Sequence, residues 1–193
     1  GYTTDEVRIA LDCAATTFYD SGTGTYKIDG KTLRRMELVD FLVDLCDRYP
    51  IISIEDPLEE EDFYGFSVLR EKLKKTIIVG DDIFVTNPKR LKKGIETGSA
   101  DAILIKPNQI GTLTETLDVV ALAKQNGYKI IISHRSGETE DTTIADLAVG
   151  LSSGIIKTGA PARGERTSKY NRLIRIEDSL GSASVFLGAK ALE

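Results

Sequence analysis

The sequence has few of the residues that mark disulfide-bonded, zinc-binding or membrane-spanning proteins. Its 193 residues include two cysteines and one histidine, His134. Cys13 and Cys46 lie in apolar sequence without metal-ligand spacing, so we interpret both as reduced, structural thiols. No apolar run is long enough to cross a bilayer, and no signal-peptide pattern is present. These absences exclude a disulfide scaffold and a membrane-spanning chain, and they favour a cytoplasmic location.

An excess of positive charge is also absent. The chain carries 25 Lys and Arg against 30 Asp and Glu, a net charge of −5, which argues against a general nucleic-acid or anionic-membrane surface. A hydrophobic content of 41% suits one α/β domain with a sizeable core. The sequence opens with Gly1 rather than Met, so we expect a truncated or proteolysed chain.

Short apolar runs alternate with amphipathic segments along the whole chain. The runs predict strands at 7–11, 51–54, 77–80, 102–105, 130–133 and 154–156. The amphipathic segments predict helices at 32–48, 62–75, 87–97, 112–126, 142–153 and 164–177, with a hairpin at 18–28. Strict alternation implies parallel strands joined by right-handed crossovers.

Each predicted strand ends at a polar residue that is able to do chemistry. These residues are Asp12, Glu55, Asp81, Lys106, His134 and Lys157, separated by 43, 26, 25, 28 and 23 positions. Repeats of this length resemble the units of a (β/α)₈ barrel, whose site lies at the carboxyl ends of its strands. A doubly wound open sheet is the rival, but no Gly-rich phosphate loop follows the first strand. We therefore predict an α/β barrel that is incomplete here, with about six of eight strand–helix units.

The strand-end residues carry charge in a definite order. Three carboxylates, Asp12, Glu55 and Asp81, come first, and converging carboxylates repel one another unless a cation or protons lie between them. Oxygen ligands without a nearby His or Cys pair favour Mg²⁺ or Mn²⁺ over Zn²⁺. The sequence therefore predicts a hard divalent metal at these three residues.

Cationic or cationisable groups follow on the later strands and predict an anionic substrate that faces the metal. They are Lys106, His134, Arg135 and Lys157, with the Ser136 hydroxyl beside them. A lysine near other cations has a lowered pKa and acts as a general base near neutrality. Metal and lysine together suit abstraction of a proton α to a carboxylate.

Each of these residues also has a plain structural interpretation. A single acid after a strand is most often a helix cap, and a single lysine usually extends into solvent. We interpret 59–62 as a helix-start acidic cluster, and 89–93 and 163–175 as solvated helix faces. For Asp82, Glu138, Glu140 and Asp141 we expect supporting or capping roles. The joint pattern, rather than any single residue, favours a site.

Five motifs in this order resemble those of the enolase family over nearly the whole chain. They are Ser53-Ile54-Glu55-Asp56-Pro57, Gly80-Asp81-Asp82, Lys106-Pro107-Asn108-Gln109-Ile110-Gly111-Thr112, Ser133-His134-Arg135-Ser136-Gly137-Glu138-Thr139-Glu140-Asp141-Thr142 and Lys157-Thr158-Gly159-Ala160-Pro161-Ala162-Arg163.

The resemblance implies a reaction and a role for each matched residue. The reaction is the reversible dehydration of 2-phosphoglycerate to phosphoenolpyruvate in glycolysis and gluconeogenesis. By this resemblance Mg²⁺ is held by Asp12, Glu55 and Asp81, and the C2 proton is removed by Lys106. The substrate contacts implied are Lys157 on the carboxylate, Arg135 and Ser136 on the phosphate, and Glu55, Lys106 and His134 within the site.

The resemblance also implies what residues 1–193 do not contain. Enolases have an N-terminal α+β domain and two further barrel strands, which are expected to supply the glutamate that protonates the departing hydroxyl. We therefore expect a C-terminal enolase portion with little activity alone, a homo-oligomer or a chain complemented by the N-terminal part. The alternatives are a non-catalytic fragment that binds Mg²⁺ or phosphorylated acids, an interaction module, and a related racemase or epimerase.

Overall fold

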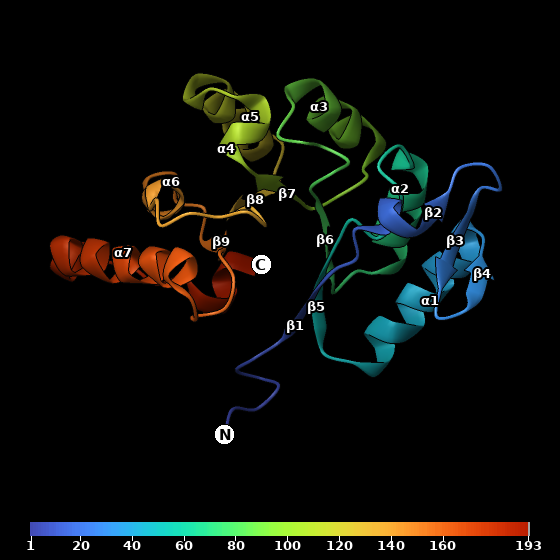
Figure 1. Cartoon of the computed structure of the whole chain (residues 1–193), viewed down its shortest axis with the longest axis horizontal. Helices are drawn as coiled ribbons and strands as arrows, with labels where there is room; N and C mark the ends of the chain where they lie inside the picture. The colour runs from blue at the N-terminus through green and yellow to red at the C-terminus, as the bar shows by residue number, and fades with distance from the viewer. Residues whose placement is uncertain (193) are drawn as a thin grey trace.

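The computed structural model describes residues 1–192, which form a curved parallel sheet surrounded by helices (Figure 1). Its six strands pair in chain order and every pairing is parallel. The strands are β1 (Ile9–Asp12), β5 (Ile51–Glu55), β6 (Ile77–Gly80), β7 (Ala102–Ile105), β8 (Lys129–Ser133) and β9 (Ile155–Lys157). All six predicted strands are confirmed, with bounds that shift by up to two residues.

Helices connect the strands and form an arc outside the sheet (Figure 1). They are α1 (Arg35–Arg48), α2 (Phe63–Lys72), α3 (Pro88–Thr97), α4 (Pro107–Ile110), α5 (Leu113–Gln125), α6 (Thr143–Gly150) and α7 (Gly164–Leu180). Local chemistry sets several starts, because Asp62, Asn87 and Thr112 accept hydrogen bonds from amides in the first turns of α2, α3 and α5. No helix among residues 1–192 is long and apolar enough to cross a membrane.

A small antiparallel sheet lies between β1 and α1. It comprises β2 (Tyr19–Asp20), β3 (Thr25–Ile28) and β4 (Lys31–Leu33), which confirms the predicted hairpin. The prediction that a helix begins at Thr32 was wrong. Thr32 lies in β4 and pairs with Lys27 of β3. Helix α1 begins at Arg35, where Glu37 accepts a hydrogen bond from the Arg34 amide at 2.7 Å. β-branched Thr32 suits a strand, and the capping contact defines the later start.

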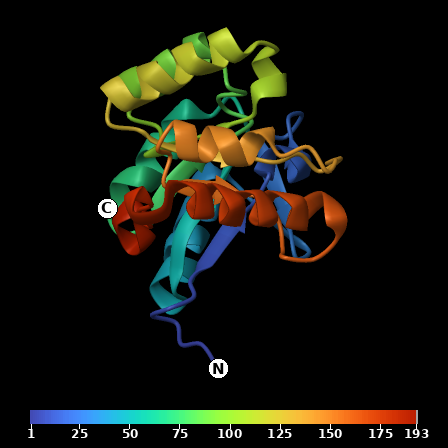
Figure 2. The same ribbon diagram turned by 90° about the vertical axis from the view of Figure 1, so that its left-hand side faces the viewer.

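The six-stranded sheet curls until its first and last strands meet at their carboxyl ends. Lys157 Nζ, on β9, lies 2.8 Å from Asp12 Oδ2, on β1. In a flat sheet five strand spacings would separate these strands by about 24 Å, beyond the reach of a lysine. The view in Figure 2 shows α6 and α7 running side by side outside this curve. The predicted incomplete α/β barrel is therefore confirmed, and a flat open sheet is excluded.

The two faces of the curved sheet are both apolar below the strand ends. Val79, Ala102 and Leu104 form one buried cluster, with Ile77 and Ile131 beside it. The alternate residues on the same strands belong to the larger core beneath the helices, which includes Ile78, Ile103, Ile105, Ile130 and Ile132. Strands buried on both faces give the continuous apolar runs seen in the sequence. Charged groups are thereby confined to the strand ends.

We predict that Gly94→Ala destabilises the fold although alanine favours helices. A Cβ at Gly94 would overlap the ring of Phe84, which is fully buried. Overpacking of this kind costs about 1–3 kcal/mol, more than the roughly 1 kcal/mol that alanine gains over glycine in a helix. Urea denaturation measures the free energy of unfolding.

Lys92→Ala, at an exposed position of the same helix, is the matched control and should leave this free energy nearly unchanged. Adding Phe84→Leu to Gly94→Ala should recover part of the loss. Equal stability of Gly94→Ala and the wild type would contradict the close packing described here.

Candidate active site at the strand ends

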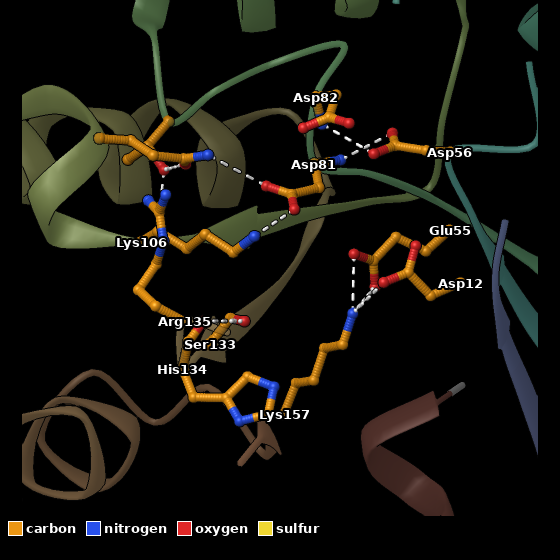
Figure 3. A network of polar contacts seen from close by, with 12 residues as sticks. Asp12, Glu55, Asp56, Asp81, Asp82, Lys106, Ser133, His134, Arg135 and Lys157 are labelled. Carbon is orange, nitrogen blue, oxygen red and sulfur yellow. Dashed lines mark hydrogen bonds and ion pairs between the residues drawn. The ribbon is translucent and has the colours of Figure 1, made fainter. Parts of the chain in front are cut away.

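The curled sheet brings the predicted strand-end residues to one edge (Figure 3). Asp12 and Glu55 are directly paired in the register of β1 and β5. The His134 amide donates to the Lys157 carbonyl at 2.9 Å, which fixes the end of β8 beside the end of β9. Side chains that are up to 145 positions apart in the sequence therefore lie within hydrogen-bonding reach.

Lys157 bridges the first two carboxylates. Its Nζ donates to Glu55 Oε2 at 2.7 Å, to Glu55 Oε1 at 2.9 Å and to Asp12 Oδ2 at 2.8 Å. Burial lowers the pKa of Lys157, but the hydrogen bonds and opposite charges of Asp12 and Glu55 outweigh burial and raise it above its ordinary value. In this state Lys157 is therefore a cation rather than a base.

Lys106 pairs with the third carboxylate. Its ammonium forms an ion pair with Asp81, and both side chains are largely buried. Gln109 Nε2 donates to Asp81 Oδ1 at 3.2 Å, while Gln109 Oε1 accepts from Thr86 Oγ1 at 2.8 Å. Thr86 Oγ1 also accepts a hydrogen bond from the Lys106 backbone amide at 3.0 Å. One network of hydrogen bonds therefore holds both Lys106 and Asp81.

Asp56 is a supporting residue whose role the sequence did not reveal. Its two carboxylate oxygens accept the amides of Asp81 at 3.0 Å and Asp82 at 2.8 Å, and its side chain is buried (Figure 3). Burial raises the pKa of Asp56 to about 7. The backbone of Asp56 has a left-handed φ of 43°, which carries the chain from β5 into the turn. Asp56 therefore holds the loop that presents Asp81.

The acidic residues fit a hard divalent cation. Glu55, Asp56 and Asp81 each place one oxygen within 4.8 Å of the others. Asp12 is linked to this group because Lys157 donates hydrogen bonds to both Asp12 and Glu55. Burial raises the pKa of Glu55 to about 7, and the charges of Asp12 and Asp81 add to this rise. An ammonium already occupies the space between Asp12 and Glu55, and an all-oxygen donor set suits Mg²⁺. The metal-ligand assignment to Asp12, Glu55 and Asp81 remains a prediction.

The loop after β8 carries the other predicted substrate contacts. Arg135 and Ser136 are exposed, and Arg135 Nη1 donates to Asn108 Oδ1 at 3.1 Å. Glu138 Oε2 accepts the Arg135 amide at 3.1 Å, which gives Glu138 the expected supporting role. Burial and the nearby charges of Arg166 and Lys157 lower the pKa of His134. Both effects favour the neutral form of His134.

The prediction that 163–175 is a solvated helix face was wrong for one side of α7. Lys169 is fully buried, and its ammonium donates to the Thr139 and Glu165 carbonyls. Arg166 reaches the backbone carbonyls of Arg135 at 3.0 Å and Ser136 at 3.2 Å. No local signal distinguishes these residues from exposed cations, because their acceptors lie about thirty positions away.

The fold and the strand ends define an α/β-barrel protein with an acidic and a basic group of side chains facing one another. The family described as "Enolase, C-terminal TIM barrel domain" matches residues 1–193. The chain belongs to this family.

Three relatives named enolase illustrate the similarity. Enolase of Methanocaldococcus jannaschii is 62% identical over 177 residues, which cover 92% of this chain and 41% of the relative. Enolase of Methanopyrus kandleri is 59% identical over 182 residues, 94% of this chain and 43% of the relative. Enolase of Methanosarcina mazei is 56% identical over 187 residues, 97% of this chain and 43% of the relative. The chain thus spans about two fifths of the length of these relatives.

We predict that Asp56→Asn lowers the free energy of unfolding by about 1–3 kcal/mol, the cost of leaving a buried amide without an acceptor. An Asn side chain keeps one acceptor oxygen and turns an NH₂ group toward the other amide. Urea denaturation provides the measurement, and Asp47→Asn at an exposed position is the control. If both variants were equally stable, Asp56 would not anchor the Asp81 loop.

Proposed function

We propose that this chain is the catalytic-barrel part of a lyase that interconverts 2-phosphoglycerate and phosphoenolpyruvate in glycolysis and gluconeogenesis. The observation that carries the proposal is the meeting of Asp12, Glu55 and Asp81 with Lys106 and Lys157 at one edge of the barrel. The relatives are named enolase, which supports the same reaction.

In this proposal each side chain has one task. Lys106, once it leaves Asp81 and loses its own proton to solvent, is a neutral amine whose Nζ accepts the proton from C2 of the substrate. Lys157, once released from Asp12 and Glu55, binds the substrate carboxylate. Mg²⁺ held by Asp12, Glu55 and Asp81 would supply positive charge that stabilises the negative charge formed when the proton leaves.

The substrate phosphate lies at the loop after β8. Arg135 offers a planar fork of donors that suits a phosphate, and Ser136 adds a hydroxyl. Both residues are exposed, and the loop backbone is held by Glu138. Neutral His134 lies beside the substrate and is able to share a hydrogen bond without adding charge.

In this proposal the remaining parts of the site correspond to the region of the longer relatives that residues 1–193 do not match. The relatives are more than twice as long as the matched region, which covers 41–43% of their length. We assign to that additional part the capping domain, two further barrel strands and the acid that protonates the departing hydroxyl. The assembled protein acts on a small molecule in the cytoplasm, as a homo-oligomer or as a complex of this chain with the N-terminal part, without nucleic acid or membrane partners.

We predict that residues 1–193 alone form little phosphoenolpyruvate, and that adding the N-terminal segment of a close relative restores the reaction. The assay contains 2-phosphoglycerate and Mg²⁺, and ultraviolet absorbance measures the phosphoenolpyruvate formed. Lys106→Ala should abolish the restored activity, because no other group then accepts the C2 proton. Lys124→Ala, at an exposed position of α5, is the control and should retain this activity. Full activity of residues 1–193 alone would show that a proton donor lies within them.

We predict that Mg²⁺ binding to this chain tightens as the pH rises toward 7 and then levels off. Burial raises the pKa of Glu55 to about 7, so below that pH its carboxyl group is protonated and Mg²⁺ must displace the proton. Affinity should therefore fall about tenfold per pH unit below 7. Isothermal titration calorimetry with Mg²⁺ measures the affinity.

Glu55→Gln removes the titrating group and should bind weakly at every pH, whereas exposed Glu71→Gln should behave as the wild type. Affinity that is independent of pH between 5 and 7 in the wild type would exclude Glu55 as a ligand.

A second candidate is a non-catalytic fragment that binds Mg²⁺ or phosphorylated acids, or an interaction module. The acidic group of Glu55, Asp56 and Asp81 and the exposed Arg135 and Ser136 lie within residues 1–193, so such binding needs no further segment. It predicts Mg²⁺ binding without product formation in any combination with the N-terminal segment.

A further inference from the structure

The amino-terminal half of α7 contacts the loop after β8, which carries Arg135 and Ser136, and the loop after β9, which follows Lys157. Three residues on one side of this helix make the contacts, and we call Arg166, Lys169 and Tyr170 the α7 clamp. Spacings of three and four positions place these residues on one helix face. The proposed reaction assigns no task to any of them.

Arg166 makes the contacts closest to the site. Its Nη1 atom lies within hydrogen-bond distance of His134 Nδ1 and donates to the Arg135 carbonyl at 3.0 Å, and its Nη2 donates to the Ser136 carbonyl at 3.2 Å. One guanidinium therefore holds three consecutive residues of the loop after β8. A planar group with several fixed donors suits such a contact better than a lysine does.

The contact with His134 also determines where the imidazole carries its proton. A guanidinium has donors and no acceptor, so His134 Nδ1 must accept and the proton of the neutral ring must lie on Nε2. The lowered pKa of His134 agrees with this, because burial and the Arg166 charge both disfavour a second proton.

Lys169 contacts a later part of the loop after β8, and Tyr170 contacts the loop after β9. The Lys169 ammonium is fully buried, donates to the Thr139 carbonyl and lies 3.4 Å from Glu138 Oε1. Glu138 in turn accepts the Arg135 amide through its other oxygen. The Tyr170 hydroxyl donates to the Gly159 carbonyl, in the loop after β9.

Gly159 leaves the room that Arg166 needs. A Cβ at Gly159 would lie 2.9 Å from Arg166 Cδ and 3.3 Å from its Cγ, and Gly159 has a left-handed φ of 81°. The aliphatic part of Arg166 thus crosses the backbone just after Lys157 and reaches the loop of the neighbouring strand. The loops after β8 and β9 are coupled through this side chain.

We propose that Arg166 is a positioning residue, which holds His134 as its Nε2–H tautomer and fixes the loop that presents Arg135 and Ser136 to an anionic substrate. Lys169 and Tyr170 complete the α7 clamp. The proposal rests on the proposed function only for the identity of the anion. The tautomer and the loop conformation are properties of this chain by itself.

Nuclear magnetic resonance of the ¹⁵N-labelled chain tests the proposal directly, because His134 is the only histidine and its ring nitrogens need no assignment. At neutral pH we expect one tautomer, with the proton on Nε2. Arg166→Met should give a mixture of tautomers and shift the amide signals of 135–139. Arg166→Lys retains one charged donor and should keep the wild-type tautomer.

Arg175→Met, at an exposed position of the same helix, is the matched control and should change neither signal set. A wild-type proton on Nδ1 would overturn the proposal. Unchanged ring and loop signals in Arg166→Met would overturn it as well. If Arg166→Met does not fold, the proton position in the wild type and in Arg166→Lys still decides the question.

The same variants then enter the turnover assay in the restored assembly. Arg166→Met should raise KM for 2-phosphoglycerate about tenfold, the value of one charge-assisted hydrogen bond, and change kcat less. Arg166→Lys should recover part of the loss. Absence of turnover in the wild-type assembly would refute the proposed function, while the ring signals would still report on Arg166.

Discussion

The carboxylates at the strand ends need cations beside them, and this requirement shapes the whole site. Glu55 and Asp81 are more than nine-tenths buried, and water alone does not stabilise two such charges at close range. Lys157 pairs with Glu55 and Asp12, and Lys106 pairs with Asp81. Because each lysine comes from a different strand than its partner, charge pairing and curling of the sheet depend on one another.

The same pairing links cation binding to anion binding. In this structure both lysines are engaged by carboxylates, so neither ammonium is free for an anionic substrate. In the proposed mechanism, a cation that replaces Lys157 between Asp12 and Glu55 would free its ammonium for the substrate. Such an exchange would make the binding of the cation and of the anion favour one another, which is positive coupling between two ligands.

Much of the fold and of the site could be predicted because the relevant signals are local. Apolar runs that end at a polar residue marked every strand end, and Asp62, Asn87 and Thr112 marked helix starts. Thr32 was misplaced because its partner, Lys27 in β3, decides its conformation, whereas the helical pattern alone continues through it. A pairing between strands overrides such a local preference.

The supporting residues could not be predicted, since their partners are distant in the sequence. The sequence offers Asp56 only as a member of a motif, but its carboxylate accepts hydrogen bonds from backbone amides 25 and 26 positions later. Lysine is a residue type usually found at the surface, and Lys169 is buried only because α7 packs against the loop after β8. The pattern of residue types in the sequence indicates candidate site residues. The residues that hold those candidates in place are determined by contacts that form only when the chain folds.

The position of α7 explains why its amino-terminal half contacts both loops. α7 follows β9 directly and packs against α6, where Arg172 Nε donates to Asp146 at 2.9 and 3.1 Å. This half-exposed ion pair adds to the packing of α7 against the helix that follows the β8 loop. The packing places Arg166 and Lys169 beside the loop between β8 and α6. Helix packing outside the barrel therefore holds the proposed phosphate-binding loop together with the contacts that Glu138 makes within the loop.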